Sequence, residues 1–454
     1  MPRSSVPPFT SHAPPLGVLL RQYAAGSALT CVPVDQGLLN RGYRLATTRG
    51  DYFLKHHFDP ETADPAAIAR QHRATQRLAD LGVPVAPPLP GRDGRTVAVV
   101  GGHAYALHPW IDGRHRHGGQ LSTVQCGRLG ALLGVVHASL ERVMPTRCQA
   151  PGEQGGEGGE GRGEDGRRDD ENAGRGRTAG PPQPTEPGGA AQRREAARGG
   201  AGAAHHCSAA RRSGSTARNR ATTPAEAAAT APGTHRPQHP RDPAQDPRPT
   251  APDSTADTAD PLPATAPSAD PADTFALIDD LLAHVHRHRP TDAFDELARH
   301  RLLERRALLE QHADRRPPPG GSVGWVHGDF HPFNLLYKGD VPAAIVDWDR
   351  LGVRPRAEEA VRAAAIFFVR PAGTLDLPKA RAYARAYRRT AGATPSELAA
   401  AVHRVWWERL NDFWMLRWHY ERGDTRADSQ FPAASALAVW WTREYDAVCE
   451  AFAA

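Results

Sequence analysis

A stretch of 120 residues, from 151 to 270, contains one large apolar side chain, Leu262. The remaining residues are small, polar or charged, and arginines nearly balance the acidic residues. Such a segment cannot bury enough apolar surface to offset the entropy lost on ordering. We therefore predict a disordered low-complexity insertion over residues 147–272. Closing a long loop costs little more than closing a moderate one, which favours a tolerated surface insertion over a linker or docking tail.

Composition narrows the class of protein. The five cysteines are scattered and form no CxxC pair, which disfavours a disulfide framework and a zinc site and fits a reducing compartment. The first 15 residues lack the apolar core of a signal peptide, and no apolar run approaches the length of a membrane span. The net charge of +5 is mild for 454 residues. We expect a cytoplasmic protein without a membrane partner.

The flanking segments follow an α+β pattern. Before the insertion, short apolar runs at 43–46, 51–55, 96–100 and 103–107 read as strands, and helices are expected over 64–81 and from 122 onward. After it, helical periodicity covers 274–314 and resumes at 357. We expect an N-terminal tail over residues 1–14 and a β-rich N-lobe over 15–108. A connector with the first C-lobe helix covers 109–146, the insertion covers 147–272, and a mainly helical C-lobe covers 273–454.

The stretch WVHGDFHPFNLLYKGDVPAAIVDWDR, residues 325–350, combines two strand-like runs with several acidic residues. A turn at 338–340 joins the runs into a hairpin, which should bring Asn334 close to Asp347. Amide and carboxylate oxygens suit Mg²⁺. Asp329 lies five residues before Asn334 and could orient a substrate hydroxyl. In phosphoryl transfer, catalysis is mostly positioning and charge neutralisation, with one carboxylate accepting the proton of the nucleophile.

HGDFHPFN followed by IVDWD closely resembles the aminoglycoside phosphotransferase/choline-kinase-like superfamily, which includes homoserine-kinase-like and spore-coat CotS-like members. The resemblance covers roughly residues 15–145 and 273–454. It implies a bilobal protein-kinase-like fold and an ATP- and Mg²⁺-dependent phosphotransferase whose acceptor is an alcohol group of a metabolite or antibiotic. Asp329 corresponds to the catalytic base, and Asn334 and Asp347 to the magnesium ligands. His327 corresponds to a histidine that packs the loop.

The resemblance also assigns nucleotide contacts in the N-lobe. Lys55 ends the strand YFLK and would pair with the α- and β-phosphates, although an edge lysine in water is the alternative. The turn over the nucleotide would contain Gly37, Asn40 and Gly42, which could equally form an ordinary hairpin turn. The backbone between 106 and 110, including Leu107 and Trp110, should hold the adenine edge.

One position departs from the family pattern. The helix that normally supplies a glutamate partner for the lysine reads AIARQHRATQRLADLG and places Gln71 there, with His72 beside it. An amide could hydrogen-bond Lys55 but could not neutralise it. This substitution supports an alternative function, a catalytically degenerate pseudokinase or scaffold protein. Nucleic-acid binding through the Arg/Gly part of the insertion ranks last, because acids balance the arginines and aromatic residues are absent there.

Three further features have open interpretations. Asp349 could touch a second metal through water or cap a turn, and His331 is expected to hydrogen-bond within the loop. Six of the nine tryptophans lie in the C-terminal helices. Core packing is the favoured interpretation, and an aromatic box for a quaternary ammonium group is the alternative.

Overall fold

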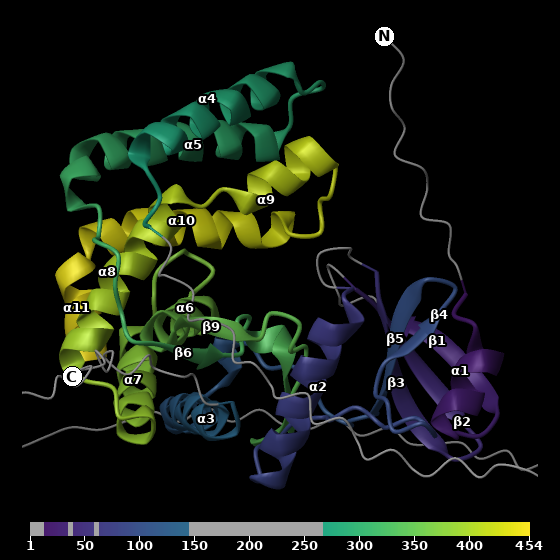
Figure 1. Cartoon of the computed structure of the whole chain (residues 1–454). Helices are drawn as coiled ribbons and strands as arrows, with labels where there is room; N and C mark the ends of the chain where they lie inside the picture. Colours follow the sequence, from purple (N-terminus) through teal and green to yellow (C-terminus); the bar gives the residue numbers. More distant parts are fainter. Residues whose placement is uncertain (1–12, 35–39, 59–62, 145–266) are drawn as a thin grey trace, which may run out of the picture. The chain divides into compact units, whose positions relative to one another are not determined.

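The computed structural model describes residues 13–34, 40–58, 63–144 and 267–454, shown in Figure 1. The expected insertion lies outside the described residues except for its last six positions, and so does Gly37. Helix α4 begins at Pro271, one residue before the expected end of the insertion, and Asp270 is its N-cap.

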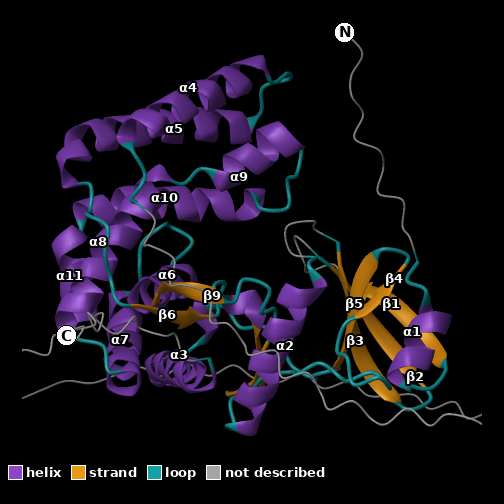
Figure 2. Ribbon diagram, viewed as in Figure 1, coloured by secondary structure: helices purple, strands orange, loops and turns teal. Residues whose placement is uncertain are grey.

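The part before the insertion is built on one antiparallel sheet. Its strands are β1 (Ala28–Val34), β2 (Arg41–Thr47), β3 (Gly50–His57), β4 (Ala98–Val100) and β5 (His103–Pro109), in the order β1-β2-β3-β5-β4. Figure 2 shows this sheet with α1 (Leu16–Tyr23) beside it. Helix α2 (Pro65–Asp80) lies between β3 and β4 in the sequence, and α3 (Thr123–Val143) follows β5.

The two faces of strand β3 have different roles. Side chains alternate along a strand, so Leu54 and Lys55 point to opposite faces of the sheet. Leu54 is fully buried and belongs to a small core with Leu19, Leu45 and Leu107. Lys55 points to the other face, where a cavity lies. Strand β3 therefore holds Lys55 in the cavity wall while the opposite face of the strand packs in the apolar core.

The part after the insertion is mainly helical, with two short strand pairs. The paired strands β6 (Val323–Val326) and β9 (Gly352–Pro355) lie at the two ends of the acidic stretch, which contains the hairpin β7–β8 (Leu335–Lys338, Val341–Ile345). The helices are α4 (Pro271–Arg287), α5 (Ala293–His312), α6 (Arg356–Phe368), α7 (Leu377–Ala391), α8 (Pro395–Asn411), α9 (Trp414–Arg417), α10 (Phe431–Arg443) and α11 (Tyr445–Ala453). Trp406, Trp407 and Trp441 are fully buried among them, so core packing accounts for these three.

Local signals set the helix starts. Ser122 and Gln125 form the expected capping box of α3, and Thr394 and Glu397 form that of α8, with Pro395 at the first helical position. The α+β prediction is thus confirmed: a β-rich part is followed by a helical part whose hairpin carries the acids. Within the described residues, every helix is too short or too polar to cross a bilayer.

Candidate active site

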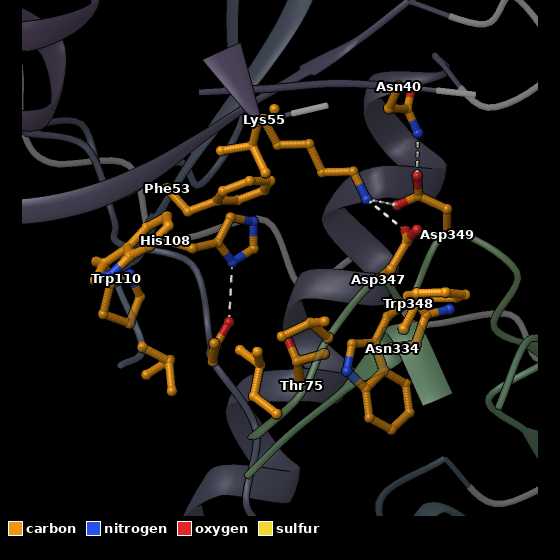
Figure 3. A pocket seen from close by; sticks show the side chains of 18 of the residues that line it. Asn40, Phe53, Lys55, Thr75, His108, Trp110, Asn334, Asp347, Trp348 and Asp349 are labelled. Carbon is orange, nitrogen blue, oxygen red and sulfur yellow. Dashed lines mark hydrogen bonds and ion pairs between the residues drawn. The ribbon is translucent and has the colours of Figure 1, made fainter. Parts of the chain in front are cut away.

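A cavity of about 760 Å³ lies against the open face of the sheet and collects most of the candidate residues. Strands β1–β3 and β5, helix α2, the segment after β5 and the hairpin all contribute to its wall. Figure 3 shows a polar end around Lys55, Asp347 and Asp349. The remainder of the wall is mainly apolar and includes Val34, Phe53, Trp110, Ile111, Leu336 and Val346.

Hairpin geometry brings two candidate metal ligands together. Leu335 pairs with Ile345, and the Val346 amide donates a 3.0 Å hydrogen bond to the Asn334 carbonyl. Asn334 and Asp347 are therefore neighbours across the hairpin, as expected. The Asn334 Nδ2 donates to the Asp329 carbonyl at 2.9 Å, which leaves the amide oxygen for another partner. The Asp347 side chain is 44% exposed and lines the cavity.

Lys55 lies between two carboxylates. Its Nζ is 2.7 Å from Asp347 Oδ1 and 2.6 Å from Asp349 Oδ1. Burial acts to lower the pKa of the Lys55 ammonium, but the two carboxylates outweigh burial and raise it. Burial acts to raise the pKa of Asp347, but Lys55 keeps it below its usual value. Burial raises the pKa of Asp349, and the adjacent Asp347 adds to this increase against the attraction of Lys55.

Gln71 and Asn40 both hold Asp349 rather than Lys55. The Gln71 Nε2 donates to the Asp349 main-chain carbonyl at 2.9 Å, and the Asn40 amide donates to its carboxylate. The Asn40 oxygen accepts a 3.1 Å hydrogen bond from the Phe58 amide. The structure thus gives Lys55 two carboxylate partners from the loop after β8. The family pattern places a glutamate of the helix there, and this chain has Gln71 at that position.

Asp329 lies on a loop whose conformation depends on His327. The Asp329 amide donates to His327 Nδ1 at 3.2 Å, and His327 Nε2 donates to the Val346 carbonyl at 3.1 Å. His327 is fully buried and its ring centroid is 4.5 Å from that of Trp348, consistent with its expected packing role.

The Asp329 carboxylate is partly exposed and charged. Its side chain is 35% exposed, and His331 Nε2 lies 3.5 Å from Asp329 Oδ2. Burial acts to raise the pKa of Asp329, but His331 and the charge of Arg350 outweigh burial and lower it. The carboxylate is therefore ionised near neutral pH and able to accept a hydrogen bond from a hydroxyl.

Glu359 is a buried residue that lies outside every motif singled out in the sequence. Its carboxylate accepts hydrogen bonds from the amides of His327 and Gly328 and lies 2.7 Å from His137 Nε2. The Tyr387 hydroxyl lies 3.0 Å from the other nitrogen of His137. This chain of contacts fixes the backbone just before Asp329. A glutamate in the otherwise apolar stripe of α6, four residues before Ala363, is the signal that could have revealed it.

The remaining nucleotide candidates occupy different places. Gly42 lines the cavity, and a Cβ there would lie 2.6 Å from the Phe53 ring, so glycine allows this ring to approach. Trp110 also lines the cavity. Leu107 does not: its side chain belongs to the sheet core, and its carbonyl already accepts a 2.7 Å bond from the Leu89 amide. A backbone contact to a base would therefore come from residues beyond 107.

The donor set fits a hard divalent cation. Asn334 offers a neutral amide oxygen, and Asp347 offers a charged carboxylate that faces the cavity. These are the ligand types that Mg²⁺ takes from proteins, usually one or two per ion with phosphate oxygens and water completing the shell.

Several known proteins are similar to this chain. The model of the phosphotransferase enzyme family matches residues 30–393, well over half of the chain. A homoserine kinase of Acidiphilium cryptum is 29% identical over 140 residues, which are 31% of this chain and 43% of the relative. The match therefore spans less than half the length of that curated relative.

Solved structures with low sequence identity also resemble the chain. An amicoumacin kinase in complex with AMP-PNP, Ca²⁺ and its ligand aligns with a TM-score of 0.46 at 12% identity, covering 94% of this chain and 93% of that one. A spectinomycin phosphotransferase in complex with ADP and spectinomycin aligns with a TM-score of 0.46 at 10% identity, covering 93% and 92%. The family model covers well over half of the chain, and on that ground the chain belongs to the phosphotransferase enzyme family.

Proposed function

We propose that this protein is an ATP- and Mg²⁺-dependent kinase that transfers the γ-phosphoryl group to a hydroxyl of a small molecule. One observation carries the proposal: Lys55, Asn334 and Asp347 line a single cavity, and the amide of Asn334 bonds the backbone of Asp329. A phosphate-binding cation, two oxygen ligands and an ionised carboxylate are the parts that phosphoryl transfer requires.

The residues divide the work as follows. Asp329 accepts the proton of the attacking substrate hydroxyl. The oxygen of that hydroxyl bonds to the γ-phosphorus as the bond between the γ-phosphorus and the β-phosphate oxygen breaks. Lys55 holds phosphate oxygens, and the apolar wall near Trp110 and Leu336 takes the base. Asn334 and Asp347 would hold Mg²⁺, which neutralises charge on the phosphates when it is bound.

The partial similarity to a homoserine kinase suggests an acceptor. A homoserine kinase phosphorylates an amino acid with a primary alcohol, and part of this chain resembles it. Homoserine is therefore the first acceptor to test, followed by a panel of other small alcohols and hydroxyl-bearing antibiotics.

The test combines binding and turnover. Thermal unfolding with ATP should show a stabilisation that requires Mg²⁺ and is lost in Asp347→Asn. Transfer of labelled γ-phosphate to the acceptor panel should be abolished in Asp329→Asn. The matched control is Asp340→Asn, which changes an exposed aspartate on the turn of the same hairpin and should leave both readouts unchanged.

Two results would overturn the proposal. Unchanged phosphorylation in Asp329→Asn would remove the assigned base. Nucleotide binding without transfer to any member of the panel would favour the degenerate or scaffold alternative, which the Gln71 substitution suggests.

A further inference from the structure

His108 is a histidine in the cavity wall that the proposed mechanism does not use. It lies on β5, lines the cavity beside Phe53 and Trp110, and its Nδ1 is 2.9 Å from the Ala86 carbonyl. Figure 3 shows this hydrogen bond and the ring between Lys55 and Trp110. The side chain therefore has one nitrogen tied to the backbone and the other free to meet a ligand.

The bond to Ala86 decides the tautomer. A carbonyl oxygen only accepts, so Nδ1 must carry the hydrogen. Burial, and the nearby Lys55 cation, lower the pKa of His108 to about 4, so the ring is neutral near pH 7. A neutral ring with its hydrogen on Nδ1 presents a lone pair at Nε2, which makes this atom a hydrogen-bond acceptor only.

No protein donor reaches that acceptor within the part of the chain that the structure describes. The bond to Ala86 accounts for the other nitrogen, and the adjacent ring of His72 is turned edge-on at 5.6 Å, with its own Nδ1 2.8 Å from Thr96 Oγ1. The surrounding wall is mostly apolar, as seen at Phe53 and Ile111. An acceptor in such a wall favours a ligand that places a donor opposite it.

Purine bases differ in the group they present at the six-position of the ring. Adenine has an exocyclic amino group, which donates, whereas guanine has a carbonyl oxygen, which accepts. We propose that His108 Nε2 accepts a hydrogen bond from the exocyclic amino group of adenine and so selects adenine over guanine nucleotides. This inference rests on the nucleotide binding of the proposed function and adds the residue that sets base preference.

The experiment varies one ligand group at a time. Dissociation constants are measured with Mg²⁺ for ATP, GTP and purine riboside 5′-triphosphate, which lacks the six-amino group. The wild type should bind ATP about tenfold more tightly than the analogue, because the analogue leaves the acceptor unpaired, and should bind GTP more weakly still. In His108→Met the ratio between ATP and the analogue should fall to about one, with the ratio between ATP and GTP reduced as well. His103→Met, an exposed change on the same strand, should keep the wild-type ratios.

The outcomes separate this inference from the proposed function. Equal affinity of the wild type for ATP and the analogue would overturn the role of His108 and would leave the proposed kinase function standing. The same result is expected if a ribose hydroxyl, and not the amino group of adenine, donates to Nε2. That comparison needs no variant, so it decides the question even if His108→Met fails to fold for lack of its bond to Ala86. Absence of any nucleotide binding to the wild type overturns both proposals.

Discussion

Replacement of Glu359 by glutamine tests how the loop before Asp329 is held. The carboxylate is only 4% exposed and accepts bonds from two consecutive backbone amides, those of His327 and Gly328, while His137 lies 2.7 Å away. Burial acts to raise the pKa of Glu359, but the bond from His137, its charge and the bond from the Gly328 amide outweigh burial and lower it. The carboxylate is therefore ionised, and both of its oxygens accept hydrogen bonds.

The magnitude follows from counting donors. Glutamine keeps one carbonyl oxygen but places an amino group where the second carboxylate oxygen stood, so one of the donors faces another donor. The change removes one hydrogen bond to a charged group, worth about 1.5–3 kcal/mol, and leaves a buried N–H unsatisfied, at about 1–3 kcal/mol. Partial relaxation reduces the sum, and we expect a loss of about 2–4 kcal/mol in the free energy of unfolding.

The assay is urea unfolding at pH 7 together with steady-state kinetics. If Glu359 positions the loop, kcat should fall while the KM for ATP changes little, because the nucleotide contacts lie on other elements. The matched control is Glu358→Gln, the preceding residue on α6, whose carboxylate pairs with Arg404 at 3.2 Å nearer the surface. Its cost should stay below about 1 kcal/mol.

The stability contributed by the Glu359 carboxylate depends on pH, and the direction of this dependence follows from its pKa. Because folding lowers the pKa of Glu359, its ionisation stabilises the protein above the pKa of unfolded glutamate, about 4.3, and this contribution is lost as the pH falls through the depressed value. The difference between wild type and Glu359→Gln should therefore shrink below about pH 4. A stability within about 0.5 kcal/mol of wild type at pH 7, with unchanged kcat, would refute the anchoring role.

Four further substitutions have clear expected outcomes. Gly328→Ala should cost about 2–4 kcal/mol in urea unfolding, because φ is +85° and a Cβ would lie 2.0 Å from the Arg350 carbonyl oxygen. Gly339→Ala, with φ of +60° and open space around it, should cost only about 1 kcal/mol, and equal losses would contradict the steric argument. Ser122→Ala should destabilise by about 1 kcal/mol through loss of the N-cap of α3, and no change by the same assay would dismiss that cap. Lys55→Met should weaken ATP binding about tenfold or more in calorimetry; retained affinity would remove its role in phosphate binding.

Short-range features were readable from the sequence. The capping boxes of α3 and α8, the hairpin β7–β8 and the closeness of Asn334 to Asp347 involve residues near one another in the chain, where turn chemistry and periodicity act directly. The α+β order of elements followed from the same local signals and is confirmed. The catalytic and ligand roles of Asp329, Asn334 and Asp347 stay predictions.

Contacts between distant segments were decided only by the tertiary structure. Gln71 bonds Asp349 across 278 residues, and His137 reaches Glu359 across 222. The sequence pattern indicated a polar residue on the helix near Lys55, but not that the carboxylate partners of Lys55 would both come from the loop after β8. Such pairings depend on how helices and sheet pack against one another, and no local propensity or spacing carries that information.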